Sequence, residues 1–157
     1  MRALITGGAG FIGFHLAKRL LLQGVEVDLV DNFRRGVRDA DLDELLTSDG
    51  VRLIEADLVE VEGARMLSTD YDLIFHFAAI IGVAIVQRQP CRVLEDNVRM
   101  LSNVLEVARR QANLRRLVFA STSEVYAGTL KHFQLPIPTH ETTPIALTDL
   151  EQPRTSY

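Results

Sequence analysis

A glycine-rich segment at residues 6–13, with the sequence TGGAGFIG, places the strongest constraint on how this chain can fold. It contains two overlapping patterns, G-x-G-x-x-G from Gly8 and G-x-x-G-x-x-G from Gly7, and both end at Gly13. In such a segment one glycine allows a tight turn, a second lets a phosphate approach the backbone, and a third lets helix and strand pack closely. The following helix would offer free N–H groups and the positive end of its dipole. The segment therefore predicts a dinucleotide-binding turn, with a plain strand-to-helix turn as the alternative.

Short apolar runs alternate with amphipathic stretches along the whole chain. The predicted strands are 2–6, 25–30, 51–55, 73–77 and 117–120. The predicted helices are 11–23, 39–47, 59–67 and a long helix within 90–112. Strands that are apolar on both faces and separated by helices indicate parallel βαβ units with right-handed crossovers. We therefore predict an α/β fold, with a Rossmann-type doubly wound parallel sheet.

Length and composition restrict the class further. A chain of 157 residues fits one domain, and a net charge of −4 gives no basic surface for nucleic acid. The one cysteine, Cys91, excludes an internal disulfide and a thiolate metal cage, so we expect no metal and a cytoplasmic location. The apolar run 73–86 is too short to span a bilayer and reads as a strand followed by a loop. Four prolines between 131 and 153 predict a long irregular loop.

Acidic residues follow the second and third predicted strands. Asp31 comes 18 residues after Gly13, where a carboxylate can accept the ribose hydroxyls and repel a 2′-phosphate. This favours NAD over NADP, although Arg34 and Arg35 follow closely and could instead contact a phosphate. Asp57 could accept the adenine amino group or simply serve as a helix cap before Val59.

The chain resembles the extended short-chain dehydrogenase/reductase family, in its NAD-dependent epimerase/dehydratase branch, over its whole length. Besides residues 6–13, the matching motifs are Asp31-Asn32-Phe33, Ala56-Asp57-Leu58, His76-Phe77-Ala78-Ala79, Asn97, residues 121–126 (STSEVY) and Tyr157. The resemblance implies NAD as cofactor and a nucleotide sugar as substrate. It places cofactor binding at Gly7, Gly10, Phe11, Ile12, Gly13, Asp31, Asn32, Asp57, Leu58, Ala78, Ala79 and Asn97. It also implies a homodimer for the full-length protein.

The same resemblance implies a reaction through a 4-keto sugar, with hydride taken from the sugar and later returned. Thr122 would hydrogen-bond the sugar oxygen, and Tyr157 would take the proton, helped by a lysine one helical turn later. Because Tyr157 is the last residue given, that lysine is absent. We therefore expect a Rossmann domain over 1–157 that lacks its C-terminal substrate-binding part and is inactive as given.

Several of these residues also have structural readings. Thr122 could satisfy a backbone group at a strand end, and Asn97 could bridge backbone groups. His76, in an apolar strand, reads as a hydrogen-bonded core histidine, and Tyr126 as a packing residue.

Ser123 and Glu124 distinguish between reactions within the family. With a glutamate at this position, the sequence resembles dehydratases and sugar-acid decarboxylases more than simple epimerases. Such a glutamate could act on the carbon next to the ketone. The sequence does not select one nucleotide sugar. Two alternatives stay open: an NAD(P)-dependent short-chain reductase of a non-sugar carbonyl compound, and a redox-silent NAD(H)-binding module.

Overall fold

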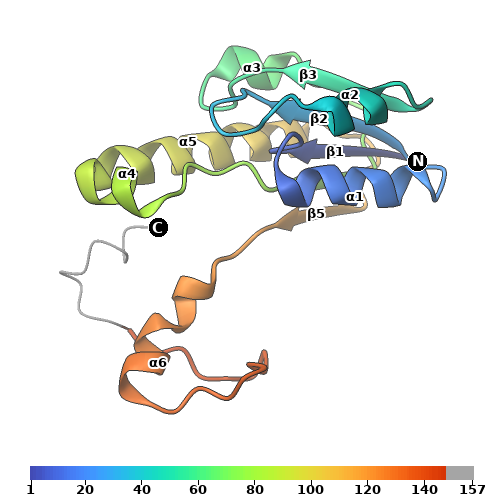
Figure 1. Ribbon diagram of the computed structural model, residues 1–157. Coiled ribbons are helices and arrows are strands. Elements are labelled where there is room, and N and C mark those ends of the chain that lie inside the picture. The colour runs from blue at the N-terminus through green and yellow to red at the C-terminus, as the bar shows by residue number, and fades with distance from the viewer. Residues whose placement is uncertain (148–157) are drawn as a thin grey trace. The chain divides into compact units, whose positions relative to one another are not determined.

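A computed structural model describes residues 1–147 of the chain (Figure 1). Two compact units make up these residues and are described separately. The first unit comprises Met1–Ala79 and Asp96–Ala120, and the second comprises Ile80–Glu95 and, of the described residues, 121–147.

The first unit is built on a parallel sheet with the strand order β3-β2-β1-β4-β5. Its strands are β1 (Arg2–Thr6), β2 (Glu26–Asp31), β3 (Val51–Glu55), β4 (Leu73–His76) and β5 (Arg116–Phe119). The strand order turns back at β1, since β2 and β3 lie on one side of it and β4 and β5 on the other. In sheets of this kind, ligands bind beyond the carboxyl ends of the strands at this reversal point. The predicted doubly wound parallel sheet is confirmed.

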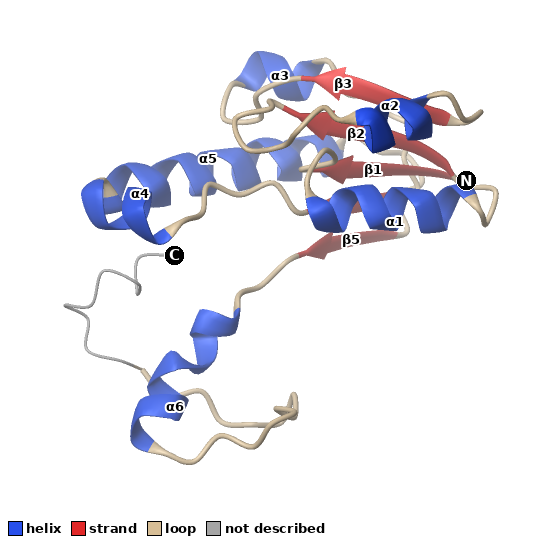
Figure 2. Cartoon of the chain, in the orientation of Figure 1, coloured by secondary structure: helices blue, strands red, loops and turns tan. Residues whose placement is uncertain are grey.

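Helices cover both faces of this sheet, as Figure 2 shows with α1 and α5 on opposite sides of the strands. Those of the first unit are α1 (Phe11–Leu21), α2 (Ala40–Leu46), α3 (Val61–Arg65) and most of α5 (Pro90–Arg109). The helices lie where periodicity predicts them. α3 is shorter than the predicted 59–67, because the first residues of that stretch form a turn held by Asp57.

Side chains along each strand point alternately to the two faces of the sheet, and each face is covered by an apolar layer. On one face, Ala3 and Ile5 of β1 pack with Ala17 and Leu20 of α1 and with neighbouring residues of β2 and α2. Leu4 points to the other face and is fully buried as well. On that face, Asn103 of α5 donates through its side-chain amide to the backbone oxygens of Leu58 and Val59, at 2.9 and 3.2 Å. Burial on both faces explains why the strands read as continuous apolar runs.

One buried charge interrupts the apolar sheet. The side chain of Asp28 in β2 is only 4 % exposed, and its carboxylate pairs with Arg2 at 2.9 Å and with Arg52 at 2.6 Å. The hydroxyl of Tyr71 donates to the same carboxylate at 2.5 Å. Burial, together with the charge of Asp28, raises the pKa of Tyr71 well above its usual range. Tyr71 therefore stays protonated and serves as a hydrogen-bond donor in the core.

The second unit is mostly helix and loop. It contains α4 (Val83–Arg88), the start of α5, the 3₁₀ helix η1 (Ser123–Tyr126) and α6 (Ala127–His132). The reading of 73–86 as a strand and a loop is wrong over its last residues, because α4 begins at Val83. Among the described residues, 133–147 form the expected irregular loop. It is anchored by the buried Thr129, whose hydroxyl donates to the oxygen of Pro144 and accepts from the N–H of Ala146.

No helix within residues 1–147 is both long enough and apolar enough to cross a membrane.

Candidate cofactor and substrate site

The glycine segment leaves the carboxyl end of β1 and turns into α1. The N–H groups of Gly7 and Gly8 both donate to the backbone oxygen of Val30 in β2, at 2.8 and 3.0 Å. Gly7 has a φ of 70°, and a Cβ at this position would lie 2.9 Å from the backbone nitrogen of Ala78. The turn therefore needs glycine here both for its backbone angles and for the close approach of the chain that follows β4.

Gly10 and Gly13 play different parts in the same segment. A Cβ at Gly13 would collide with the backbone oxygen of Gly7, so this glycine lets the helix pack on the turn. Gly10 has an ordinary φ of −83° and is the N-cap of α1. Among the described residues, a Cβ at Gly10 would meet only the oxygen of Gly7, at 3.1 Å. Packing therefore demands glycine at position 13 and leaves room at position 10.

The beginning of α1 suits an anion. Gly10 offers no side-chain cap, and the first turn of α1 holds no acidic residue. The first N–H groups of a helix have no partner within the helix, and the helix dipole favours negative charge there. Phe11 and Ile12 form this turn and are 81 % and 63 % exposed. These features fit the pyrophosphate of a dinucleotide.

Asp31 ends β2 next to this turn. Its carboxylate accepts the N–H of Ala9 at 3.0 Å and the N–H of Phe33 at 2.9 Å. The side chain thus links the glycine segment to the loop after β2. Asn32 lies in that loop and accepts the N–H of Arg34 through its side-chain oxygen, at 3.1 Å. The structure places Asp31 beside the glycine turn, where the sequence predicts a ribose contact.

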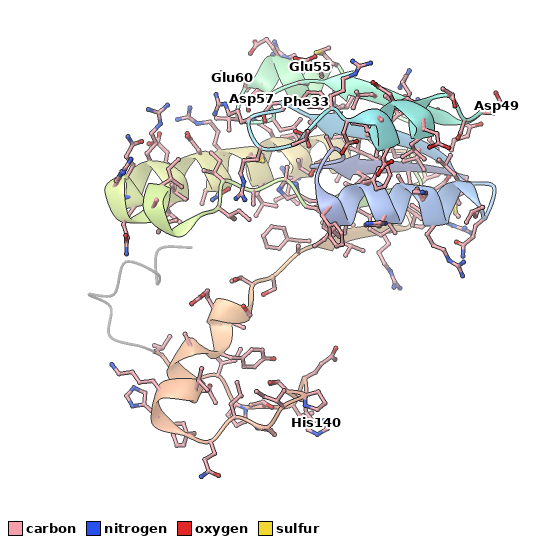
Figure 3. All side chains as sticks on the ribbon, in the orientation of Figure 1. Phe33, Asp49, Glu55, Asp57, Glu60 and His140 are labelled. Atoms are coloured by element: carbon pink, nitrogen blue, oxygen red, sulfur yellow. The ribbon has the colours of Figure 1, made fainter. Side chains whose placement is uncertain are left out.

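Asp57 follows β3 on the same edge of the sheet; Figure 3 labels it together with Phe33. One carboxylate oxygen of Asp57 accepts the N–H of Val59 at 3.0 Å, and the other pairs with Arg34 at 3.1 Å. The interpretation of Asp57 as a helix cap is wrong, because the N-cap of α3 is Glu60. Asp57 instead holds the turn before the helix through the N–H of Val59. Leu58 is buried.

The chain after β4 lies against the glycine turn. The N–H of Ala78 donates to the hydroxyl oxygen of Thr6 at 3.1 Å, and Ala79 beside it is exposed. His76 is 2 % exposed and lies 2.7 Å from the same hydroxyl, which fits the predicted core histidine. Burial lowers the pKa of His76 to about 4. Asn97 is half-buried in α5.

Thr122, Ser123 and Glu124 belong to the second unit. Thr122 is the N-cap of η1, and its hydroxyl accepts the N–H of Glu124 at 3.3 Å, as the structural reading of this residue expects. Ser123 is exposed, whereas Glu124 and Tyr126 are half-buried. Tyr157 lies outside the described residues.

Two structural supports of the site were not assigned a role from the sequence. Thr6 is completely buried and accepts the N–H groups of both Phe77 and Ala78. Asn103 binds the two oxygens that follow Asp57 in the chain. The sequence signal that could have indicated Asn103 is its place beside Val104, on the buried side of an amphipathic helix.

The reversal of strand order, the glycine turn and the acidic end of β2 together define a doubly wound, dinucleotide-binding protein. The NAD dependent epimerase/dehydratase family matches residues 3–157, and the chain belongs to this family, whose cofactor is NAD.

Characterised relatives cover several reactions. The chain is 38 % identical to UDP-N-acetyl-alpha-D-glucosaminuronate decarboxylase of Bacillus cytotoxicus, over 80 % of this chain and 37 % of that protein. It is 32 % identical to UDP-glucose 4-epimerase of Erwinia amylovora, over 92 % of this chain and 42 % of that protein. The crystal structure of Thermus thermophilus UDP-glucose 4-epimerase in complex with NAD is similar, with a TM-score of 0.72 and 33 % identity over 93 % of this chain and 44 % of that one. The chain thus spans less than half the length of each.

Proposed function

We propose that this chain is the NAD-binding part of an enzyme that oxidises a UDP-sugar at C4 and then acts on the resulting 4-keto sugar. The observation that carries the NAD-binding part is the position of Asp31, whose carboxylate accepts the N–H of Ala9 at 3.0 Å beside the start of α1, where no side chain caps the helix. The substrate class rests on the relatives. Phosphates at the helix and ribose hydroxyls at Asp31 are two parts of a site for the adenosine diphosphate half of NAD. Gly7, Gly10 and Gly13 shape the turn, and Ala78 lies against it.

The remaining predicted contacts belong to the same proposal. Phe11 and Ile12 would offer their N–H groups to the pyrophosphate, and Asp57 would accept the adenine amino group. Asn32, Leu58, Ala79 and Asn97 complete the proposed cofactor contacts.

Bound NAD would supply the acceptor for the hydride that leaves the sugar carbon. Thr122 would donate to the sugar oxygen, because its hydroxyl accepts the N–H of Glu124 and still carries its own proton. Tyr157 would take the proton of the sugar hydroxyl as the hydride leaves. These roles rest on the family resemblance and on the position of Thr122 at the start of η1.

Glu124 favours decarboxylation or dehydration over simple epimerisation. A 4-keto group acidifies the neighbouring carbon and makes a C5 carboxylate a β-keto acid, which loses carbon dioxide readily. Ser123 and Glu124, in the first turn of η1, would hold that carboxylate or take the C5 proton. The similarity to a UDP-sugar-acid decarboxylase supports this reading, and the similarity to a 4-epimerase keeps epimerisation as the second candidate.

The proposal also includes a homodimer of the full-length protein. Val98 and Leu105 are exposed on α5 and flank the half-buried Leu101, while Met100 and Val104 face the core. Positions 98, 101 and 105 lie on one side of the helix and form an apolar stripe. A second copy covering this stripe would explain it. We also propose a cytoplasmic location, which the exposed thiol of Cys91 supports.

The activity is tested with purified full-length protein and its retained nucleotide. We expect UDP-N-acetylglucosaminuronate to produce a transient near-ultraviolet absorbance of reduced nicotinamide, followed by release of carbon dioxide. UDP-glucose serves as the comparison, since interconversion with its C4 epimer would favour the second candidate. Absence of bound dinucleotide, with no absorbance change for either sugar, would contradict the proposal.

A further inference from the structure

Arg34 is fixed at both its backbone and its side chain, although it lies in an exposed loop. Its N–H donates to the side-chain oxygen of Asn32 at 3.1 Å, and its guanidinium Nη2 lies 3.1 Å from a carboxylate oxygen of Asp57. The side chain of Arg34 is 62 % exposed and that of Asp57 is 23 % exposed. An exposed pair of this kind is weak, so it biases the position of the guanidinium without locking it in place.

The loop that carries Arg34 is shaped closely around Asp31. Phe33 adopts a φ of 55°, which side-chain-bearing residues rarely do, and its N–H is bound by the carboxylate of Asp31. A Cβ at Gly36 would lie 2.8 Å from both Oδ1 of Asp31 and Cβ of Ala9. The loop therefore returns to the carboxyl end of β2. Arg34 lies on a turn in which Phe33, on one side, and Gly36, on the other, both lie close to the carboxylate of Asp31.

The position of Arg34 bears on the choice between NAD and NADP. Arginines that follow the second strand of a dinucleotide fold are the residues that accommodate a 2′-phosphate. In this chain the guanidinium of Arg34 is paired with the carboxylate that follows β3, so its charge is already compensated.

We propose that Asp57 is a second determinant of cofactor specificity. Asp31 excludes the 2′-phosphate by its own charge, and Asp57 excludes it by holding Arg34 away from the 2′ position. This inference rests on the proposed dinucleotide site and adds a residue that acts through Arg34.

The variant Asp57→Asn separates this role from the others. The asparagine oxygen still accepts the N–H of Val59 and could still accept the adenine amino group, but it no longer holds a guanidinium by charge. We expect the ratio of the NADP to the NAD dissociation constant to fall by roughly two- to fivefold, because the freed guanidinium gains only what the weak, exposed pair with Asp57 withheld. Both constants are measured by isothermal titration calorimetry on full-length protein stripped of nucleotide.

Two matched double variants complete the experiment. Adding Arg34→Ala to Asp57→Asn should restore the wild-type ratio, whereas adding Arg35→Ala should leave the gain in place. An unchanged ratio in Asp57→Asn, or a gain that survives Arg34→Ala, would overturn the inference while NAD binding by the wild type upholds the proposed site. Wild-type protein that binds neither dinucleotide would overturn the proposed function and this inference together.

Discussion

The hydroxyl oxygen of Thr6 lies 2.7 Å from Nδ1 of His76, and the two residues are register partners at the carboxyl ends of β1 and β4. The same oxygen accepts the N–H groups of Phe77 and Ala78, at 3.2 and 3.1 Å. With both its lone pairs used, Thr6 donates its own proton to Nδ1, so His76 is the neutral tautomer protonated at Nε2. This buried pair fixes the chain after β4 against the glycine turn.

Replacing the hydroxyl of Thr6 should destabilise the fold. Thr6→Val keeps the shape but leaves Nδ1 of His76 and the N–H of Ala78 without their partner, while the N–H of Phe77 keeps the backbone oxygen of Thr6. We expect the free energy of unfolding to fall by roughly 2–4 kcal/mol, measured by urea denaturation. Thr6→Ser is the matched control, since it keeps the hydroxyl and loses one methyl group at a cost of about 1 kcal/mol. Equal losses in the two variants would show that the hydrogen bonds are not what matters.

His76 should make stability depend on pH. Burial lowers its pKa to about 4 from an ordinary 6.5, so the unfolded state binds the proton first as the pH falls. The stabilisation is complete above pH 6.5 and is lost as the pH falls toward 4, by roughly 1.4 kcal/mol for each unit of pKa difference. His76→Asn retains an acceptor near Nδ1 and does not titrate. Its unfolding free energy, measured at intervals between these pH values, should decline less steeply than that of the wild type.

The sequence was sufficient for the sheet and the glycine turn because both depend on local patterns. Apolar runs of strand length recur between amphipathic stretches. The glycines lie at the junction of the first predicted strand and the first predicted helix. α4 was missed because it follows β4 in one apolar run, and its N-cap, Gly82, gives no side-chain cap. The Thr6–His76 and Arg34–Asp57 pairs could not be predicted, since each depends on which strands become neighbours and in what register.

Gly10 and Gly13 should respond differently to valine. Gly10→Val should abolish dinucleotide binding, because the new side chain would stand where the phosphates approach α1, while the fold survives. Gly13→Val should disrupt the fold itself, because the Cβ would collide with the backbone oxygen of Gly7. Circular dichroism reports the fold and calorimetry reports binding. Normal NAD binding by Gly10→Val would mean that the segment is only a turn.

Asp28 should be essential for stability. Two guanidinium groups and the hydroxyl of Tyr71 converge on its buried carboxylate. Asp28→Asn keeps the size of the side chain but removes the charge that compensates Arg2 and Arg52. Breaking a buried ion pair on one side typically costs about 3–5 kcal/mol, although the exposure of Arg52 should place this variant near the lower end. Asp70→Asn, which removes an exposed partner of Arg2, is the control and should cost roughly 0–1 kcal/mol. Thermal unfolding of the two variants should therefore differ clearly.

Glu124 should act after the hydride has left the sugar. In the proposed reaction, oxidation at C4 needs Thr122 and Tyr157, whereas Glu124 serves the carbon next to the ketone. Glu124→Gln in the full-length enzyme should therefore still form reduced nicotinamide with substrate but stall at a keto sugar. Rapid-mixing absorbance follows the first step, and mass spectrometry of the quenched reaction identifies the keto sugar. Thr122→Val is the complementary variant, because it should slow the first step and accumulate no keto sugar. Unchanged turnover in Glu124→Gln would make this residue structural, a support of η1, and 4-epimerisation would then be the better assignment.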